Sequence, residues 1–437
     1  MLYLSMKYLL VLLGGVPRKT VNSGKVKIVG YSDFSDVAIR WYFLSGDEIS
    51  IQSFSSTMQA DQHSGPRVVH VTTVHEPFDP RILPKQLHSL RGGGFDARLL
   101  APHHMSEEVH DVPIHALPKP THRGDRLALQ PTVFRRALAL DAALYQVHDP
   151  ELLPCAFLLK KATGARTVYD MHEDYRTKGR LTGRTLRLLE RWAFHWVDHV
   201  LLAEESYCTI VQGTGVEHTF LPNYFRPLED RGESSLNLLK DSVPPSRLLY
   251  TGTIAAARGL NTMVDMASDI KQANRQETVE MVGICHHAGQ RDSAEARIRR
   301  ERLGGVIERT GWDRYVRPSN MLPHYKRADV GLVLFEPHPN YKETLPTKFF
   351  EYLHYGLPII CSDFPLWRRF VERHDCGVTV PPNDPAAVFG VLDAWRADPE
   401  RYRQCVANAR TAAQEYRWAA VEDRLLSVYR RLLNEGD

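Results

Sequence analysis

The segment ETLPTKFFEYLHYGLPIICSD, which spans residues 343–363, holds residues whose types and spacing are typical of a phosphate site. Pro346 and Thr347 favour the start of a helix, and Gly356 favours its end. The free backbone amides at a helix start, together with the positive end of the helix dipole, bind anions. Lys348 adds a positive charge beside them, so the segment predicts an anion site that suits phosphate.

Two carboxylates flank this predicted site. Glu343 precedes the helix on a loop, whereas Glu351 lies within the helix, three residues beyond Lys348 and on the same face. An ionised carboxylate accepts hydrogen bonds from two hydroxyls, so the pair can flank a bound sugar nucleotide. The alternative is a surface helix with an ion pair between Lys348 and Glu351, but the capping glycine and the buried strand that follows favour a site.

Further polar side chains come directly after strands that we expect in the first half of the chain. They are His75, Asp79 and Arg81 after one strand, His148 and Asp149 after another, and Asp170, His172 and Glu173 after a third. Ligands of open parallel sheets bind at the carboxyl ends of the strands, so these side chains are expected at one cleft. His148 and Asp149 are expected either to reach this cleft or to cap the helix that begins at Pro150.

The elements that must position these residues follow a regular pattern. Short β-branched runs alternate with helical stretches from Arg67 onward, as in βα units with parallel sheets. Strands are expected at 67–74, 97–102, 144–148, 165–172 and 199–204, and again at 247–252, 278–283, 305–312, 330–335, 358–363 and 377–382. The class of fold is therefore α/β.

A break in this alternation divides the chain. Residues 226–246 are rich in charge, serine and proline and lack periodicity, which is typical of a linker. We therefore expect an N-terminal domain over residues 66–225 and a second α/β domain over residues 247–415. A final amphipathic helix within residues 416–437 is expected to pack back across the first domain.

Composition excludes several other classes of protein. Of the 437 residues, 43% are hydrophobic and 24% are charged, which is the usual mix of a globular chain. The formal net charge of +3 gives no reason to expect nucleic acid as a partner. The six cysteines lack the spacing of a zinc site or a disulfide framework, and no apolar run reaches the roughly 18 residues of a spanning helix. We expect a cytoplasmic protein.

Together these motifs resemble the retaining GT-B glycosyltransferases of family 4. The spacing Glu343-x7-Glu351 matches the Glu-x7-Glu motif of that family. Other stretches occur in the family's order, namely VVHVTTVHEPFDPRI, VDHVLLAEES, LPNYF, LLYTGTIAAARGL and YKRADVGLVLFEP. The resemblance covers residues 66–430 and implies two Rossmann-like doubly wound domains that face a central cleft. It also implies that the first domain binds the acceptor and the second binds a nucleotide sugar.

The resemblance implies roles in the second domain. In the family, the first glutamate of the motif contacts the donor sugar near its anomeric carbon and the second holds the ribose hydroxyls, which points to Glu343 and Glu351. The phosphate loop of the family usually has the sequence Gly-Arg-x4-Lys-Gly. The aligned residues here are Gly252, Thr253, Arg258 and Gly259. Because Thr253 replaces the usual arginine, we expect Arg258 to clamp the diphosphate and Lys348 to supply the second positive charge, without a metal ion.

The resemblance also implies roles in the first domain. His172 corresponds to the histidine that lines the family's catalytic cleft, where it would contact the donor sugar or the acceptor, and Asp170 or Glu173 would orient its ring. Asp79 and Arg81 are expected to shape the acceptor side of the cleft or to form a buried ion pair. A metal site around Asp170 and His172 is disfavoured, since neighbours along a strand point to opposite faces.

The implied reaction moves a sugar, with retention at its anomeric carbon, from a UDP-, GDP- or ADP-linked donor to a glycan or lipid-linked acceptor. The usual setting of such enzymes is cell-surface or exopolysaccharide biosynthesis, and no cofactor is expected besides the donor. Two alternatives remain open. One is a nucleotide-sugar 2-epimerase of the same fold, and the other is a non-catalytic partner subunit, which the missing arginine at Thr253 favours.

Two segments fall outside this scheme. Residues 176–191 carry six basic residues against one acid, and leucines and tryptophans continue to Trp196. A basic helix of this kind suits an anionic membrane surface, so residues 176–197 are expected either to touch the inner membrane from its cytoplasmic face or to present a solvated basic face. Residues 1–65 carry no motif. Because Met58 lies just ahead of the first strand, residues 1–57 are expected to be a poorly ordered extension or a misassigned start.

Overall fold

The structure, a computed structural model, describes residues 65–172, 180–227, 245–317 and 320–434. Glu173, residues 1–57 and most of the expected linker therefore lie outside the described residues. The chain divides into two compact units, residues 1–61 and residues 62–437, and the described residues all belong to the second unit.

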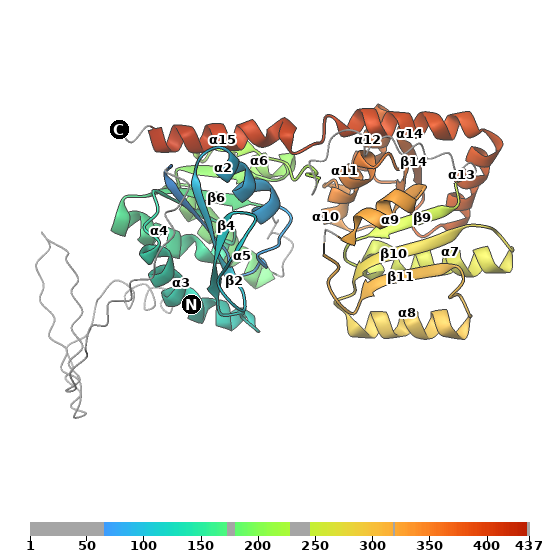
Figure 1. Cartoon of the computed structure of the whole chain (residues 1–437), viewed down its shortest axis with the longest axis horizontal. Coiled ribbons are helices and arrows are strands. Elements are labelled where there is room, and N and C mark those ends of the chain that lie inside the picture. Colours follow the sequence, from blue (N-terminus) through green and yellow to red (C-terminus); the bar gives the residue numbers. More distant parts are fainter. Residues whose placement is uncertain (1–64, 173–179, 228–244, 318–319, 435–437) are drawn as a thin grey trace, which may run out of the picture. The chain divides into compact units, whose positions relative to one another are not determined.

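An eight-stranded sheet with the order β3-β4-β2-β1-β5-β6-β7-β8 forms the first half of this unit (Figure 1). Its strands are β1 (Arg67–Val71), β2 (Asp96–Pro102), β3 (Glu107–Val109), β4 (Val112–Leu117), β5 (Leu144–Val147), β6 (Arg166–Met171), β7 (His199–Leu202) and β8 (His218–Phe220). All neighbours pair in parallel except β3, which runs antiparallel to β4. The sequence did not indicate β3, β4 or β8, which lie toward the two edges of the sheet.

The helices of the first half connect these strands. They are the π-helix η1 (Ile82–Leu87), α2 (His88–Gly92), α3 (Arg123–Ala139), the 3-10 turn η2 (Pro150–Leu152), α4 (Leu153–Thr163), α5 (Arg180–Ala193), the 3-10 turn η4 (Glu205–Tyr207) and α6 (Cys208–Val211). The helix expected after β1 starts as a π-helix and continues directly into α2. Short π-helical stretches are frequent at functional sites, and this one follows the loop that carries Asp79 and Arg81.

A six-stranded, all-parallel sheet with the order β11-β10-β9-β12-β13-β14 forms the second half. Its strands are β9 (Arg247–Thr251), β10 (Thr278–Ile284), β11 (Ile307–Trp312), β12 (Val330–Val333), β13 (Ile359–Ser362) and β14 (Gly377–Val380). This order reverses between β9 and β12, as in the classic Rossmann fold, and the corresponding reversal in the first sheet lies between β1 and β5. The expected α/β fold with two Rossmann-like sheets is confirmed.

The helices of the second half cover both faces of its sheet, with α8 below and α11, α12 and α14 above in Figure 1. They are the 3-10 turn η6 (Ala256–Arg258), α7 (Leu260–Gln272), α8 (Ala288–Arg300), α9 (Leu322–Arg327), α10 (Pro339–Lys342), α11 (Thr347–His354), α12 (Pro365–His374), α13 (Pro385–Ala397) and α14 (Pro399–Ala413). Because both faces are covered, strands such as β12 (sequence VGLV) and β13 (sequence IICS) are buried along their whole length.

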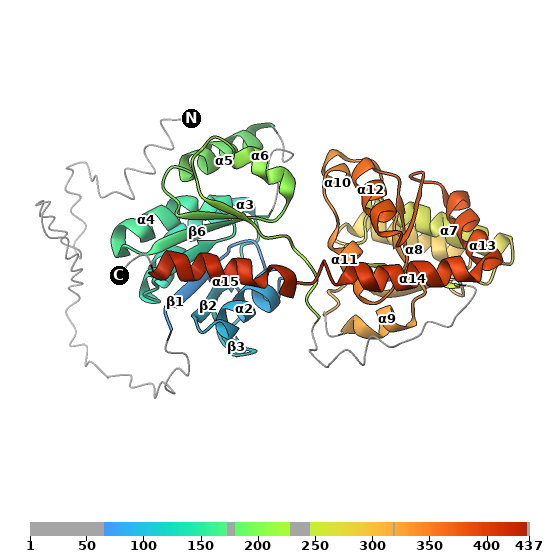
Figure 2. The same ribbon diagram turned by 90° about the horizontal axis from the view of Figure 1, so that it is seen from above.

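The last helix, α15 (Ala419–Asn434), packs on the first sheet although it follows the second half in sequence. It lies beside α2 in Figure 2. Trp418, Leu425 and Tyr429 are buried in one hydrophobic cluster with residues of β1 and β2. This packing makes residues near the C-terminus part of the core of the first half.

The exposed face of α5 carries both basic and apolar side chains. Leu188 and Trp192 have 60% and 37% of their side chains exposed, and Arg184 and Arg191 are exposed beside them. Trp192 also contacts Phe157 on α4 through its ring. None of the helices in the described part of the chain is long and apolar enough to span a bilayer.

Candidate active site

A cavity of about 1860 Å³ is lined by loops that follow the strands of both sheets. The loops after β1 and β6 contribute from the first half, and the loop after β9 and the end of β10 contribute from the second. Open parallel sheets bind ligands at this position, next to the reversal of strand order. The loop between α10 and α11 and the start of α11 complete the wall on the second side.

Two glycines shape the loop after β9. Gly252 and Gly259 have φ angles of 98° and 85°, in the left-handed region that favours glycine. A Cβ at Gly259 would lie 2.1 Å from the backbone oxygen of Leu334, and a Cβ at Gly252 would lie 2.9 Å from Nζ of Lys348. Glycine at both positions therefore lets this loop approach β12 and the ammonium group of Lys348.

Two cations, Lys348 and Arg258, lie close together at the loop after β9. Lys348 is only 6% exposed, and its Nζ lies 5.1 Å from the ring centre of Tyr250 and 5.6 Å from that of Phe335. The Arg258 guanidinium lies 5.6 Å from the same Phe335 ring. Burial and the nearby Arg258 lower the pKa of Lys348 to about 7. No carboxylate of the described residues forms an ion pair with either cation, although the charge of Glu351 on the same wall acts on Lys348.

Glu351 is anchored through one of its two oxygens. Its Oε2 accepts a hydrogen bond of 2.7 Å from the Tyr325 hydroxyl and a longer one of 3.4 Å from the Thr251 hydroxyl. Tyr325 is itself held by stacking on Tyr355, with ring centres 4.4 Å apart. The side chain lines the cavity, which leaves Oε1 available for a ligand.

The remaining residues of the predicted motif lie around the same wall. α11 spans Thr347–His354 with Pro346 at its N-cap, close to the predicted helix. Glu343 is exposed on the loop before it and lines the cavity, as do Thr347 and Thr253. The backbone oxygen of Thr253 accepts a 2.6 Å hydrogen bond from the Tyr250 hydroxyl. The structure thus brings Glu343, Thr347 and Thr253 to one wall of the cavity, and their roles stay predictions.

In the first half, Arg81 and Asp170 form a buried ion pair. Two hydrogen bonds of 2.6 and 2.9 Å join the guanidinium to the carboxylate, and Arg81 Nη1 also donates to the backbone oxygen of Leu221. Asp170 is fully buried, and the pKa of its carboxyl is held well below the usual range by Arg81 and by hydrogen bonds from His148 and His172, although burial opposes this shift. Arg81 therefore forms a buried ion pair with Asp170 and not with Asp79, and it also lines the cavity.

His148 and Asp149 do not reach the cavity. His148 is 1% exposed, with Nδ1 3.0 Å from an Asp170 oxygen and Nε2 3.1 Å from Nδ1 of His70. Asp149 occupies the N-cap position before Pro150, but its side chain does not cap the helix and instead accepts hydrogen bonds from Thr72 and Thr73. Both expectations for these side chains are wrong, because His148 bonds to Asp170 and His70, and Asp149 bonds to Thr72 and Thr73, in the interior of the first half.

His172 lies at the cavity, with a second histidine behind it. Its Nδ1 donates to the backbone oxygen of Asp170 at 3.0 Å, so Asp170 orients the ring mainly through its carbonyl. Its Nε2 lies 2.9 Å from Nε2 of His75, and His75 Nδ1 donates to Asp79 at 3.0 Å. These contacts, with a backbone bond from Arg81, hold the pKa of Asp79 far below its ordinary value, against burial. Asp79 and His172 line the cavity, whereas Glu173 lies outside the described residues.

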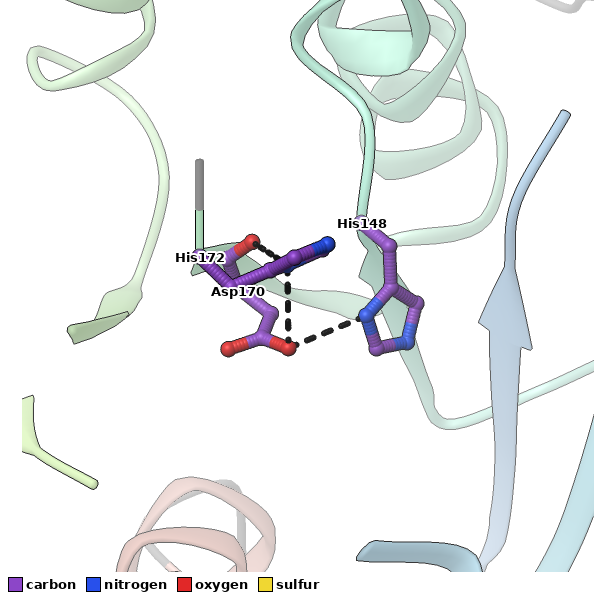
Figure 3. Close-up of side chains that lie close together, drawn as sticks. All are labelled: His148, Asp170 and His172. Carbon is purple, nitrogen blue, oxygen red and sulfur yellow. Dashed lines mark hydrogen bonds and ion pairs between the residues drawn. The ribbon is translucent and has the colours of Figure 1, made fainter. Parts of the chain in front are cut away.

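Three of these side chains are close enough to share a cation, as Figure 3 shows. Ligand atoms of His148, Asp170 and His172 all lie within 4.8 Å of one another. However, the Asp170 oxygens already accept hydrogen bonds from Arg81, Gln86 and His148, and the guanidinium repels a second positive charge. The donor atoms therefore fit a hydrogen-bonded network better than a metal.

Sequence patterns missed several residues around this network. The buried members are His70, Gln86, Gln146 and Tyr429, and Tyr429 on α15 contacts both His70 and Gln146. At the cavity, the missed residues are Lys85 and Glu204. Lys85 donates to the Asn223 side chain at 2.5 Å, and burial lowers its pKa to about 7. No local motif marks these residues, because their partners come from distant parts of the chain.

Two family models match the chain. The model described as glycosyl transferases group 1 matches residues 240–412, and the model described as glycosyl transferase 4-like domain matches residues 81–219. D-inositol 3-phosphate glycosyltransferase 1 of Catenulispora acidiphila is 26% identical over 239 residues, which are 54% of this chain and 54% of the relative. The chain spans about half the length of the curated relatives it matches.

Solved structures share the fold across most of the chain. Sucrose-phosphate synthase from Thermosynechococcus elongatus superposes with a TM-score of 0.64 at 18% identity, covering 85% of this chain and 100% of the other. Anabaena HepE in complex with UDP-glucose gives a TM-score of 0.62 at 13% identity, covering 83% and 99%. The fold is therefore GT-B. The two family models that match the halves of the chain both describe glycosyl transferases.

Proposed function

We propose that this protein is a retaining glycosyltransferase of family 4, which moves a sugar from a nucleotide-sugar donor to a glycan or lipid-linked acceptor. The observation that carries the proposal is the pair of cations Arg258 and Lys348, which lie beside the start of α11 and have no carboxylate partner among the described residues. A diphosphate supplies the missing negative charge, and the amides at the helix start add hydrogen bonds. The HepE structure with UDP-glucose supports a nucleotide sugar as the ligand.

The other groups of this wall suit the remaining parts of a nucleotide sugar. The free oxygen of Glu351 accepts hydrogen bonds from the ribose hydroxyls, and Glu343 on the loop before α11 contacts the donor sugar near its anomeric carbon. Thr253 lies where the family usually has an arginine. Because Nζ of Lys348 lies next to Gly252, Lys348 takes over the charge of that arginine, which argues against a non-catalytic partner subunit.

The reaction breaks the bond between the anomeric carbon and a diphosphate oxygen and forms a bond from that carbon to an acceptor oxygen. The acceptor hydroxyl passes its proton to the leaving diphosphate, whose negative charge grows as its bond to the anomeric carbon breaks. Arg258, Lys348 and the α11 amides stabilise that charge and take the place of a metal ion. His172 contacts the donor sugar or the acceptor from the first half, and His75 and Asp79 support its ring.

We place the enzyme in the cytoplasm, at the cytoplasmic face of the membrane, in the biosynthesis of cell-surface glycans or exopolysaccharide. The outer face of α5 supports this setting. Leu188 and Trp192 are exposed there, next to the exposed Arg184 and Arg191, which together suit an anionic lipid surface. The part of the expected basic stretch over residues 176–179 lies outside the described residues.

Transfer assays of two variants test the proposal. We expect Glu343→Gln and Arg258→Ala each to lower transfer by on the order of a hundredfold or more, because each removes a charge that acts on the reacting groups. Label from UDP-glucose, GDP-mannose and ADP-glucose is followed into lipid and oligosaccharide acceptors, and circular dichroism checks the fold. Sugar conversion without any acceptor would indicate a 2-epimerase instead.

The matched controls are Glu400→Gln and Arg403→Ala, the same exchanges in an exposed ion pair on α14. Both controls should keep full transfer activity. Full activity in Glu343→Gln and Arg258→Ala as well would contradict the assignment of this wall as the donor site.

A further inference from the structure

Glu204 follows β7 at the same edge of the sheet as His172. β7 pairs in parallel with β6, and the backbone N–H of Ala203 donates to the Met171 oxygen at 3.0 Å. This pairing places residues 172 and 204 after neighbouring strands, and both side chains line the cavity. Glu204 belongs to the wall that we assign to the acceptor, away from Arg258 and Lys348.

The carboxyl of Glu204 makes no polar contact that stabilises the described part of the fold. The residue is the N-cap of η4, but its side chain makes no capping hydrogen bond. It has no hydrogen bond or ion pair with any described residue, in contrast to Asp79, Asp149 and Asp170. The positive charge that acts on Glu204 is that of Arg81, whose guanidinium is already bonded to Asp170 and to the Leu221 oxygen.

Glu204 is half-buried at the cavity, and a half-buried carboxyl without a partner among the described residues gains when a ligand completes its hydrogen bonds. Burial raises the pKa of Glu204 to about 8, so the carboxyl is largely uncharged at neutral pH. The carboxylates whose charges act on Lys85 are Glu351 and Asp79, not Glu204. Glu204 therefore offers hydrogen bonds with little charge of its own.

The hydrogen-bonding capacity and the low charge of Glu204 indicate which chemical class of ligand binds there. A hydroxyl both donates and accepts a hydrogen bond, so it suits a carboxyl in either protonation state, whereas a phosphate would be repelled whenever Glu204 ionises. The aromatic ring of Tyr224, which also lines the cavity, suits the apolar face of a sugar ring. A polyhydroxylated ring meets both requirements.

We propose that Glu204 binds a hydroxyl of the acceptor and thereby selects a neutral, polyhydroxylated group, such as a sugar or cyclitol, at this end of the cavity. This inference rests on the proposed transferase function and names the acceptor chemistry of its site. Glu204 is a specificity residue in this scheme, and it takes no part in binding the donor.

Carbon-13 NMR of the glutamate carboxyls tests the binding directly in the full-length protein. The Glu204 signal is assigned by its loss in Glu204→Gln. Glucose, mannose, N-acetylglucosamine and myo-inositol are then titrated with UDP, GDP or ADP present. We expect at least one of these neutral probes to shift the Glu204 signal in a saturable manner. The matched control is Glu151, a glutamate of the same half that lies outside the cavity and pairs with Arg126. Its signal should not move.

Kinetics of transfer to the best probe supply the second readout. We expect Glu204→Leu to raise KM for the probe about tenfold, as the loss of one hydrogen bond to a ligand implies, while Glu204→Gln stays within about threefold. Nucleotide binding should be unchanged in both variants, and Glu151→Gln should behave as the wild type. Absence of a Glu204 shift with all four probes, an unchanged KM in Glu204→Leu, or a stronger response to glucose 6-phosphate would each overturn the inference. Failure of the wild type to bind any nucleotide would instead overturn the proposed function.

Discussion

The two walls of the cavity handle buried charge in opposite ways. In the wall of the second half, Arg258 and Lys348 lie close together without a carboxylate partner, and burial shifts the pKa of Lys348 downward. In the wall of the first half, Arg81 and Asp170 neutralise each other through several hydrogen bonds. The difference indicates that the second wall is built to receive a charged ligand, whereas the first is built to hold a fixed shape.

The largest effect on stability should follow from breaking the ion pair of the first wall. Asp170→Asn leaves the buried Arg81 without its counter-ion, so we expect the free energy of unfolding to fall by about 3–5 kcal/mol in urea denaturation. Asp375→Asn is the control, since Asp375 forms an exposed pair with Arg401 and the exchange should cost about 1 kcal/mol or less. A similarly small loss for Asp170→Asn would remove the contrast between the walls.

The buried lysine of the second wall should make nucleotide binding depend on pH. Lys348 has a pKa of about 7 in the free protein, and a bound diphosphate raises it, so binding takes up a proton above neutral pH. We expect the affinity for the nucleotide to fall by up to about tenfold per pH unit between about pH 7 and pH 9. Isothermal titration calorimetry in buffers of different ionisation enthalpy measures this uptake.

The control for that slope is the variant Lys119→Met, which removes an exposed lysine paired with Glu76 and should leave the slope intact. Lys348→Met should abolish the slope.

The stability of the free protein, in contrast to its nucleotide affinity, should rise with pH. The native pKa of Lys348 lies below the unfolded value of about 10.4, so the unfolded chain binds more protons and the contribution to stability rises from about pH 7 toward pH 10. A nucleotide affinity that stays constant over this range would contradict the role of Lys348.

The smallest effect on the fold is expected at the outer face of the first half. Leu188→Gln and Trp192→Gln remove exposed apolar groups, so each should change the free energy of unfolding by no more than about 1 kcal/mol. Binding to vesicles that contain anionic lipid should nevertheless fall, as measured by co-sedimentation. Leu127→Gln, an exchange at another exposed leucine on α3, is the control that should keep vesicle binding. Unchanged binding in both α5 variants would refute membrane contact through this helix.

The second wall was predictable from the sequence because its chemistry is local. Pro346, Thr347 and Lys348 are consecutive, and Glu351 follows one turn later on the same helix. The predicted helix start at Thr347 is confirmed. Alternation of strands and helices also predicted the fold class, since every expected strand has a counterpart in the two sheets.

The first wall was not predictable in the same way, because its contacts join distant residues. His70 and Tyr429 are 359 residues apart, and His148 is 22 residues from Asp170. Periodicity placed His148 at the end of a strand but gave no sign of the partners that would bury it. The edge strands β3 and β8 were missed because three residues are too few to show alternation.

The most direct test of the central claim is the thermal stabilisation of the protein by UDP, GDP and ADP. We expect at least one nucleotide to stabilise the wild type, by about 2.7 kcal/mol at a hundredfold excess over its Kd. Arg258→Ala and Lys348→Met should lose this stabilisation, while Lys119→Met should keep it. Stabilisation that persists in both Arg258→Ala and Lys348→Met, or is absent from the wild type with all three nucleotides, would contradict a donor site at this wall.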